Sequence, residues 1–380
     1  MVKQLPSKKQ KIDRVPICFS GFVALMLVQT PYMRIGTIIA FTTIMLTLLA
    51  FGFNRNTVKI TTFNVSLFAF VLLVFIRSAL NSEINSYKLI LQGIMCIFLA
   101  SYEANKSDSE FLKRVVEISS VVYAILIIGA CMKMGDTKYI HGTIELFRTS
   151  LDPNFAGLPL VMGASFLLYN VFEKRKMMFS LTGFAIILVA IFYTASRGNA
   201  ITILSICVLE LVAFFFAKKV SLTKKIFMLI LAIAFLGALF YYLSNNMGAQ
   251  WDRMSNFGQG SDNGRFELWK KALDMWLDNL IFGVGIGGFV SSVGMATHNT
   301  YLTVLVETGF VGMILFIVFI GCLVKKSLKC GFDVFVMLIA VLIHMSFLDA
   351  LDSRCVWAAI GFVAIYFLPE RGVYSDKKYD

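Results

Sequence analysis

The feature that most constrains this sequence is a succession of apolar segments, each about twenty residues long, between short polar stretches. An α-helix of that length just crosses the hydrocarbon core of a bilayer. Hydrophobic residues make up 58% of the 380 residues, and charged residues only 15%. A soluble domain has no core large enough to bury that much apolar surface. The composition therefore excludes a soluble enzyme, a disordered chain and a fibrous repeat, and it predicts an all-α polytopic membrane protein.

The positions of these segments predict about twelve transmembrane helices. The first follows a basic N-terminal stretch without a small-residue cleavage signature, so we expect it to stay attached. The expected spans are 16–30, 33–53, 61–77, 87–103, 115–132, 154–171, 177–195, 199–217, 226–243, 299–323, 332–349 and 354–368. The expected organisation is nine spans in residues 1–243, a long loop at 244–298, three spans in 299–368 and a tail at 369–380.

The net charge of +12 has two interpretations, nucleic-acid binding and the positive-inside rule of membrane proteins. The positions of the charges distinguish them. If the N-terminus is cytoplasmic, most of the 35 Lys and Arg residues fall on the inner side, in clusters such as Lys174-Arg175-Lys176. We therefore expect cytoplasmic N- and C-termini and no nucleic-acid partner. The seven cysteines are scattered without a CxxC pair, so neither disulfides nor a metal cluster is expected.

The loop 244–298 lies on the outer side in this topology, and loops of this length between short connections are usually functional. After a turn-rich stretch, apolar residues recur at helical spacing while charged residues fall largely elsewhere on the helical wheel. The apolar positions are Phe266, Trp269, Leu273, Trp276 and Leu280. The pattern predicts an amphipathic helix and leaves two placements open, in the outer lipid interface or packed on the bundle.

The segment Gly283-Val284-Gly285-Ile286-Gly287-Gly288 has the letters of a dinucleotide-binding loop, GxGxxG. That motif requires a preceding strand and a cytosolic location. Here a helix is expected before it and the topology places it outside, so we reject the nucleotide interpretation. Glycines also let a backbone approach a ligand or a helix closely, and this is the expectation we keep.

Two short motifs begin expected spans on the outer side. Asp152-Pro153-Asn154 has the composition of a capped helix start, and it is also placed to line an outer cavity. Arg197 lies in a tight turn between two spans. Its guanidinium is either a snorkelling group at the interface or a fork that binds a phosphate.

The chain has three histidines, and His298 is best placed for chemistry. It precedes the tenth span beside the Gly-rich segment, and an imidazole titrates near neutral pH, which suits a general base. His141 lies in a polar loop with no partner signature, and His344 lies on an apolar helix face where packing is expected. Glu307 lies inside the tenth span, where a carboxylate is either functional or paired with a buried arginine.

Taken in order, these motifs resemble the O-antigen ligase/polymerase superfamily, which includes the O-antigen ligases and the Wzy-type polysaccharide polymerases. The resemblance covers about residues 150–325, and the flanking spans agree only in hydropathy. The motifs are Asp152-Pro153-Asn154, Ser196-Arg197-Gly198, Gly264-Arg265 with Trp269, the Gly-rich segment 283–288, His298-Asn299-Thr300-Tyr301-Leu302 and Glu307-Thr308-Gly309.

The resemblance implies a GT-C-like, metal-independent glycosyltransferase without a cofactor, in the bacterial cytoplasmic membrane and with an extracytoplasmic active site. Its donor would be an oligosaccharide linked to undecaprenyl pyrophosphate; the further partners implied are membrane lipids, a flippase and a chain-length regulator. By motif, the catalytic residues are Arg197, Arg265 and His298. The residues expected to bind substrate are Arg197, Arg265, Asn299, Tyr301, Asp152, Asn154, Glu307 and Trp269. Arg253 has no assigned counterpart in the motifs.

The residues themselves lead to compatible chemistry. An activated sugar outside the cell must arrive on a lipid, and arginines near the outer surface can hold its diphosphate and stabilise it as a leaving group. His298 can then accept the proton of the attacking hydroxyl, with inversion at the anomeric carbon. We favour a polymerase; an O-antigen ligase-type transferase is the alternative, because both use the same donor. A polysaccharide transporter or flippase is less favoured, since the two halves show no matching broken helices.

Overall fold

The computed structural model describes residues 14–28, 60–80, 87–134, 144–146, 149–216 and 262–367, with isolated positions between 39 and 46 and between 221 and 245. The second and ninth expected spans, at 33–53 and 226–243, lie outside the continuously described residues. So do the expected tail at 369–380, His141 and Arg253.

The described chain is built from α-helices, and it contains only two short pairs of strands. The helices are α1 (Arg14–Val28), α3 (Thr62–Leu80), α4 (Tyr87–Leu99), α5 (Lys106–Met134), α6 (Pro153–Phe172), α7 (Met177–Tyr193), α8 (Arg197–Phe216), α11 (Asp262–Leu277), α12 (Gly288–Val293), α13 (Thr300–Cys330), α14 (Phe332–His344) and α15 (Arg354–Ala364). Strand β1 (Glu103–Ala104) pairs in parallel with β4 (Tyr366–Phe367), and β2 (Ile144–Leu146) pairs antiparallel with β3 (Thr149–Leu151).

Among the described residues, five helices are long and apolar enough to cross a membrane, namely α3, α5, α6, α8 and α13. Helices α1, α4, α7, α14 and α15 are apolar but shorter. This confirms the prediction of an all-α membrane protein. Several ends differ from the expected ones. The helix expected at 115–132 begins at Lys106, the span expected at 332–349 ends as a helix at His344, and the span expected at 299–323 continues to Cys330.

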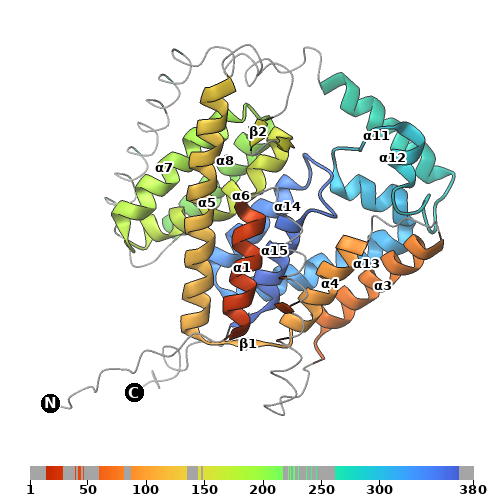
Figure 1. Ribbon diagram of the computed structural model, residues 1–380, viewed down its shortest axis with the longest axis horizontal. Helices are drawn as coiled ribbons and strands as arrows, with labels where there is room; N and C mark the ends of the chain where they lie inside the picture. The colour runs from red at the N-terminus through yellow and green to blue at the C-terminus, as the bar shows by residue number, and fades with distance from the viewer. Residues whose placement is uncertain are drawn as a thin grey trace.

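Helix α6 is the most enclosed of the five long helices and packs against α5, α7, α8 and α14 (Figure 1). Its contact with α5 is close because Gly163 leaves room for Ser120, whose hydroxyl donates to the carbonyl oxygen of Pro159 at 2.7 Å. This bond joins α5 to the middle of α6. On the other side of the bundle, the rings of Phe70, Phe316 and Phe319 join α3 to α13.

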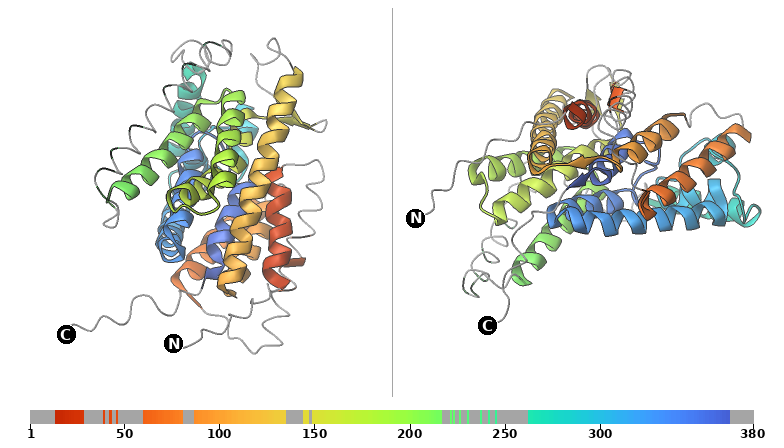
Figure 2. Two further views of the ribbon diagram at one scale, coloured as in Figure 1. Left: turned by 90° about the vertical axis from the view of Figure 1, so that its left-hand side faces the viewer. Right: turned by 90° about the horizontal axis from the view of Figure 1, so that it is seen from below.

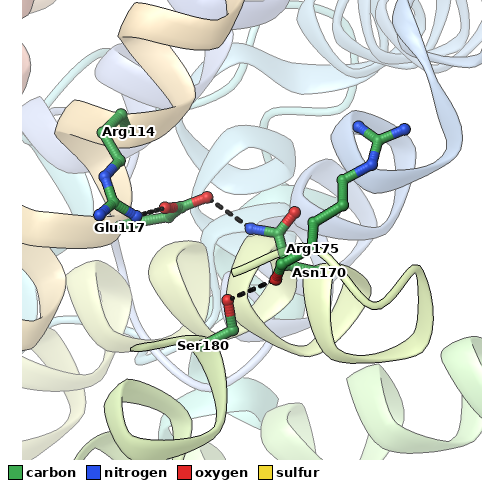
Figure 3. A network of polar contacts seen from close by, with 5 residues as sticks. All are labelled: Arg114, Glu117, Asn170, Arg175 and Ser180. Atoms are coloured by element: carbon green, nitrogen blue, oxygen red, sulfur yellow. Dashed lines mark hydrogen bonds and ion pairs between the residues drawn. The ribbon is translucent and has the colours of Figure 1, made fainter. Parts of the chain in front are cut away.

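Opposite the first turn of α6, the bundle has a polar end that carries the basic cluster of residues 174–176. There Arg114 and Asn170 both contact the carboxylate of Glu117, at 2.9 and 2.7 Å (Figure 3). Lys113 forms an ion pair with Asp333 at the start of α14. These contacts hold α5, α6 and α14 together at the end that we expect to face the cytoplasm.

Helix α13 is not the single straight span that the hydropathy predicts. At Gly309 the backbone leaves the helical region, with φ 64° and ψ −164°. The rings of Tyr301 and Phe316 lie 6.1 Å apart, although fifteen residues of straight helix would separate them by about 22 Å along the axis. The helix therefore bends sharply at Gly309, into a short N-terminal part and a long C-terminal part.

The Gly-rich segment satisfies the backbone groups that this break exposes. The amides of Val284 and Gly285 donate to the carbonyls of Val306 and Glu307, at 2.9 and 3.0 Å. In return, the amides of Phe310 and Val311 donate to the carbonyls of Leu280 and Ile281. The glycines thus bring the backbone close to a helix, which is one of the two uses expected for them. Arg77 of α3 adds a bond from its Nη2 to the carbonyl oxygen of Gly283 at 2.9 Å.

Helix α11 and the short α12 lie together against α13, as the teal segments of Figure 1 show and the view from below in Figure 2 agrees. Leu268 and Ala272 face this contact and are buried. Phe266, Leu273 and Leu277 are 65%, 42% and 58% exposed. A helix is therefore present where one was predicted, but it ends at Leu277, before Leu280 of the predicted apolar stripe. Leu268 and Ala272, outside that stripe, pack on the bundle, while Phe266 and Leu273 of the stripe are exposed.

Candidate active site

The first turn of α6 is built as the sequence predicts for a capped helix. Asp152 has an extended backbone, and its Oδ1 accepts a hydrogen bond from the amide of Asn154 at 2.7 Å. Pro153 occupies the first helical position, where its missing N–H costs nothing. Asp152 is half-buried rather than fully solvated.

The turn between α7 and α8 lies directly beside this helix start. Ser196 donates its hydroxyl to Oδ1 of Asn154 at 2.6 Å, and Asn199 donates its side-chain amide to the carbonyl of Pro153 at 2.9 Å. Arg197 is the first residue of α8 and is half-buried. The N-termini of α6 and α8 are therefore adjacent, which places Arg197 near the Asp152 motif.

His344 joins these two helix starts to the end of α14. Its Nε2 donates to the carbonyl oxygen of Asn154 at 2.8 Å, and its Nδ1 lies 3.2 Å from the hydroxyl of Thr202 in α8. The side chain is completely buried. The expectation that His344 is a packed residue is confirmed, and the structure adds that it connects three helices.

The start of α13 meets the same group of helix ends. The amide and the hydroxyl of Thr300 donate to the carbonyls of Met345 and Leu348, at 2.9 and 2.8 Å. Asn299 caps α13, because its Oδ1 accepts from the amides of Tyr301 and Leu302. Three helix N-termini, those of α6, α8 and α13, thus converge. Each carries a partial positive charge that favours an anionic ligand.

His298 precedes this cap with an unusual backbone, since its φ of 54° is in the left-handed region that non-glycine residues seldom adopt. The imidazole is half-buried. Burial, together with the nearby positive charge of Arg265, lowers the pKa of His298, and Asp152 opposes the shift. The imidazole is therefore neutral near pH 7 and able to accept a proton.

Arg265 and Trp269 both come from α11. The guanidinium of Arg265 is half-buried and close enough to influence His298 electrostatically. Trp269 lies one helical turn further along, and its indole N–H donates to the carbonyl oxygen of Thr297 at 2.9 Å. Trp269, which we expected to bind substrate, thus bonds the protein's own backbone through its indole N–H.

Asp349 is a residue that the sequence analysis does not identify. It lies in the connection between α14 and α15, bonds the side chain of Thr303, and has a pKa raised by burial to about 6. The hydroxyl of Thr303 is 2.7 Å from that of Thr297, next to His298. Asp349 fell within an expected apolar span, yet a carboxylate there was itself a signal.

Two residues that we expected to bind substrate, Tyr301 and Glu307, contact other parts of the protein instead. The hydroxyl of Tyr301 donates to the carbonyl oxygen of Leu342 at 2.7 Å, and its ring packs toward Phe316. Glu307 is buried at the break in α13, beside the Gly-rich segment. Within the part of the chain that the structure describes, no three His, Cys, Asp or Glu side chains group as metal ligands.

The site therefore brings together one residue from each of four sequence motifs. Arg265 and Asp152 both lie within electrostatic reach of His298, and Arg197 begins the helix next to Asp152. Two guanidinium groups and three helix N-termini suit a multiply charged anion, while a neutral imidazole suits proton transfer.

Comparison with known proteins supports the resemblance over part of the chain. A search of curated proteins finds no match to this chain. The sequence model of the O-antigen ligase family matches residues 182–317, a range that includes Arg197, Arg265, His298 and Glu307. This match over residues 182–317 confirms the resemblance to the O-antigen ligase/polymerase superfamily in that part of the chain.

Proposed function

We propose that this protein is a membrane glycosyltransferase that polymerises oligosaccharide repeat units carried on undecaprenyl pyrophosphate. The observation that carries the proposal is the convergence of Arg265, His298 and Asp152 at the helix start beside Arg197. The reaction would take place at the extracytoplasmic end of the bundle. The lipid-linked donor would reach the site from the membrane, since nucleotide sugars do not occur there.

Arg197 and Arg265 are proposed to bind the diphosphate of the donor. A guanidinium presents two parallel N–H groups to one phosphate, so the two side chains match its two phosphoryl groups. When the bond between the anomeric carbon and the phosphate oxygen breaks, negative charge grows on the diphosphate. Fixed guanidinium groups and helix N-termini stabilise that charge most strongly in the transition state.

His298 is proposed as the general base. A hydroxyl oxygen of the acceptor sugar attacks the anomeric carbon, and His298 takes the hydroxyl proton as the new bond forms. The bonding electrons of the old carbon–oxygen bond leave with the lipid diphosphate. Attack opposite the leaving group inverts the anomeric configuration. The lowered pKa of His298 keeps the imidazole unprotonated at neutral pH, as this step requires.

Polymerase and ligase differ in the acceptor, and donor binding is common to both. In the polymerase that we propose, the acceptor is the terminal sugar of another lipid-linked repeat unit. In the alternative, the finished glycan passes to a separate anchor. Purified protein should be incubated with lipid-linked repeat units alone, with His298→Ala protein as the negative control.

A ladder of products from the repeat units alone would support the polymerase. Transfer only after a separate acceptor is added would contradict the polymerase and identify a ligase-type enzyme. Absence of transfer under both conditions, with correctly folded protein and donors of several sugar compositions, would contradict a glycosyltransferase.

A further inference from the structure

Trp269 lies on α11 where it faces the same way as Arg265. Residues four apart on a helix project from the same side, so the two side chains are neighbours along α11. The ring of Phe266 contacts the indole edge-on at 5.5 Å, with an angle of 73° between the planes. The indole is half-buried, and its orientation is fixed by this contact and by the bond to Thr297.

The bond from the indole N–H reaches the residue directly before His298. Its acceptor is the carbonyl oxygen of Thr297, at 2.9 Å, and the side chain of Thr297 is completely buried. That side chain is held in turn by α13, since its Oγ1 donates to the carbonyl of Asn299 and accepts from the amide of the same residue. Thr297 thus links the two helices: its carbonyl oxygen bonds α11, and its hydroxyl bonds the start of α13.

This connection matters because the backbone of His298 is strained. A non-glycine residue seldom adopts the left-handed region, so neighbouring contacts must hold it there. The cap of Asn299 fixes the residue after His298, and the indole bond fixes the residue before it. The position of the imidazole relative to Arg265 therefore depends on both the Asn299 cap and the indole bond.

From these contacts we propose that Trp269 is a positioning residue, which holds the helix carrying Arg265 against the loop carrying His298 through its bond to Thr297. The proposal rests on the proposed function, in which Arg265 binds the diphosphate and His298 accepts the proton. The indole N–H itself does not contact the substrate; it fixes the separation between the two groups that do. A small displacement of reacting groups reduces turnover strongly, even without loss of binding.

Trp276 provides a matched control on the same helix. It lies seven residues after Trp269, and its ring packs edge-on against Phe310 at 5.0 Å. Its buried Nε1 has no hydrogen-bond partner among the described residues. Replacing Trp276 by Phe therefore removes an indole without removing a hydrogen bond, whereas replacing Trp269 by Phe removes both an indole and its hydrogen bond.

The first experiment compares turnover by Trp269→Phe and Trp276→Phe with lipid-linked donor. We expect Trp269→Phe to lower kcat about tenfold, with KM for the donor changed less than twofold. Trp276→Phe should change each constant less than twofold. Equal losses in the two variants, or unchanged kcat in Trp269→Phe, would overturn the proposal. If Trp269→Phe does not fold, 3-benzothienylalanine at position 269 tests the same bond, because sulfur replaces only the N–H.

A second measurement does not depend on glycan transfer. The protein without donor is treated with diethyl pyrocarbonate at a series of pH values, and modification of His298 is quantified by mass spectrometry. If α11 is released, the imidazole becomes less buried and the charge of Arg265 moves away, so the midpoint for His298 should rise toward about 6.5 in Trp269→Phe. The midpoint should stay at the wild-type value in Trp276→Phe.

The transfer rates and the His298 midpoint together distinguish the positioning role of Trp269 from the proposed glycosyltransferase function. A raised midpoint in Trp269→Phe, with no transfer even by wild-type protein, would support the positioning role and contradict the proposed function. Normal transfer, with the same His298 midpoint in wild type, Trp269→Phe and Trp276→Phe, would support the proposed function and overturn the positioning role.

Discussion

Gly283 and Gly309 are in backbone contact at the break in α13: a Cβ on either residue would lie 2.6 Å from the amide nitrogen of the other. Both have positive φ, of 66° and 64°. The contact is possible only because neither residue has a side chain. It lets the segment 280–285 enter the break and form four backbone hydrogen bonds there. The position of the N-terminal part of α13, which begins beside His298, thus depends on this pair of glycines.

Gly309→Ala should destabilise the protein by about 2–4 kcal/mol, because the Cβ would meet the carbonyl oxygen of Ile281 at 2.4 Å in a strained backbone. Thermal unfolding of the purified protein in detergent measures the loss. Gly321→Ala on the same helix is the control, since no atom lies within 4 Å of its added Cβ. A Gly309→Ala protein with the same melting temperature as wild type would contradict the close packing at the break in α13.

Arg265→Lys should lower turnover on the order of 100-fold although the charge is kept, because an ammonium does not reproduce the two parallel N–H groups of a guanidinium. Lys271→Ala is the matched control; Lys271 lies on the same helix and is exposed. Steady-state rates with lipid-linked donor provide the measurement. Near-normal turnover by Arg265→Lys, together with an inactive Arg265→Ala, would show that charge alone matters.

His298→Ala should remove most turnover and leave donor affinity nearly unchanged, because the arginines still bind the diphosphate. The wild-type rate should fall only at a pH below about 6.5, since burial and Arg265 lower the pKa and protonation removes the accepting lone pair. Donor affinity and turnover are measured separately at two pH values. Weakened affinity with preserved turnover at saturation would mean that His298 serves as a cation and not as a base.

Asp349→Asn should change how stability depends on pH. Burial raises the pKa of Asp349 to about 6, so the folded state binds a proton more tightly than the unfolded chain does. Its ionisation therefore makes wild type less stable as the pH rises from about 4 to 6. The difference in melting temperature between Asp349→Asn and wild type should grow in favour of the variant across that window. A constant difference would contradict the raised pKa.

The expected topology predicts which positions react from outside. In a protein whose native cysteines are replaced, single cysteines at 197, 265 and 298 should react with a membrane-impermeant thiol reagent in intact cells. Cysteines at 174 and 218 should react only after permeabilisation. Asp152 precedes one end of α6 and position 174 follows the other end. The twenty-residue helix separates them by about 30 Å. Labelling of 174 in intact cells would reverse the orientation.

Features with local causes are predictable from the sequence. Asp152 and Pro153 start α6 because a carboxylate accepts an amide bond and proline fits the first turn, and both depend on adjacent residues alone. The helix at 262–277 follows from spacing, and so does the burial of His344 on an apolar face. The family motifs add Arg265 and His298, which the structure places near each other.

The sequence by itself determined that this is a helical membrane protein, where its long apolar helices lie, and which motifs carry the candidate chemistry. Tertiary structure decided the break at Gly309, the acceptor of the Trp269 indole and the approach of Asp349 to Thr303. The physical reason is that hydropathy and capping act over one or two turns of chain. The partners of a broken backbone, an indole N–H or a half-buried carboxylate come from residues distant in sequence, and packing alone brings them within hydrogen-bond distance.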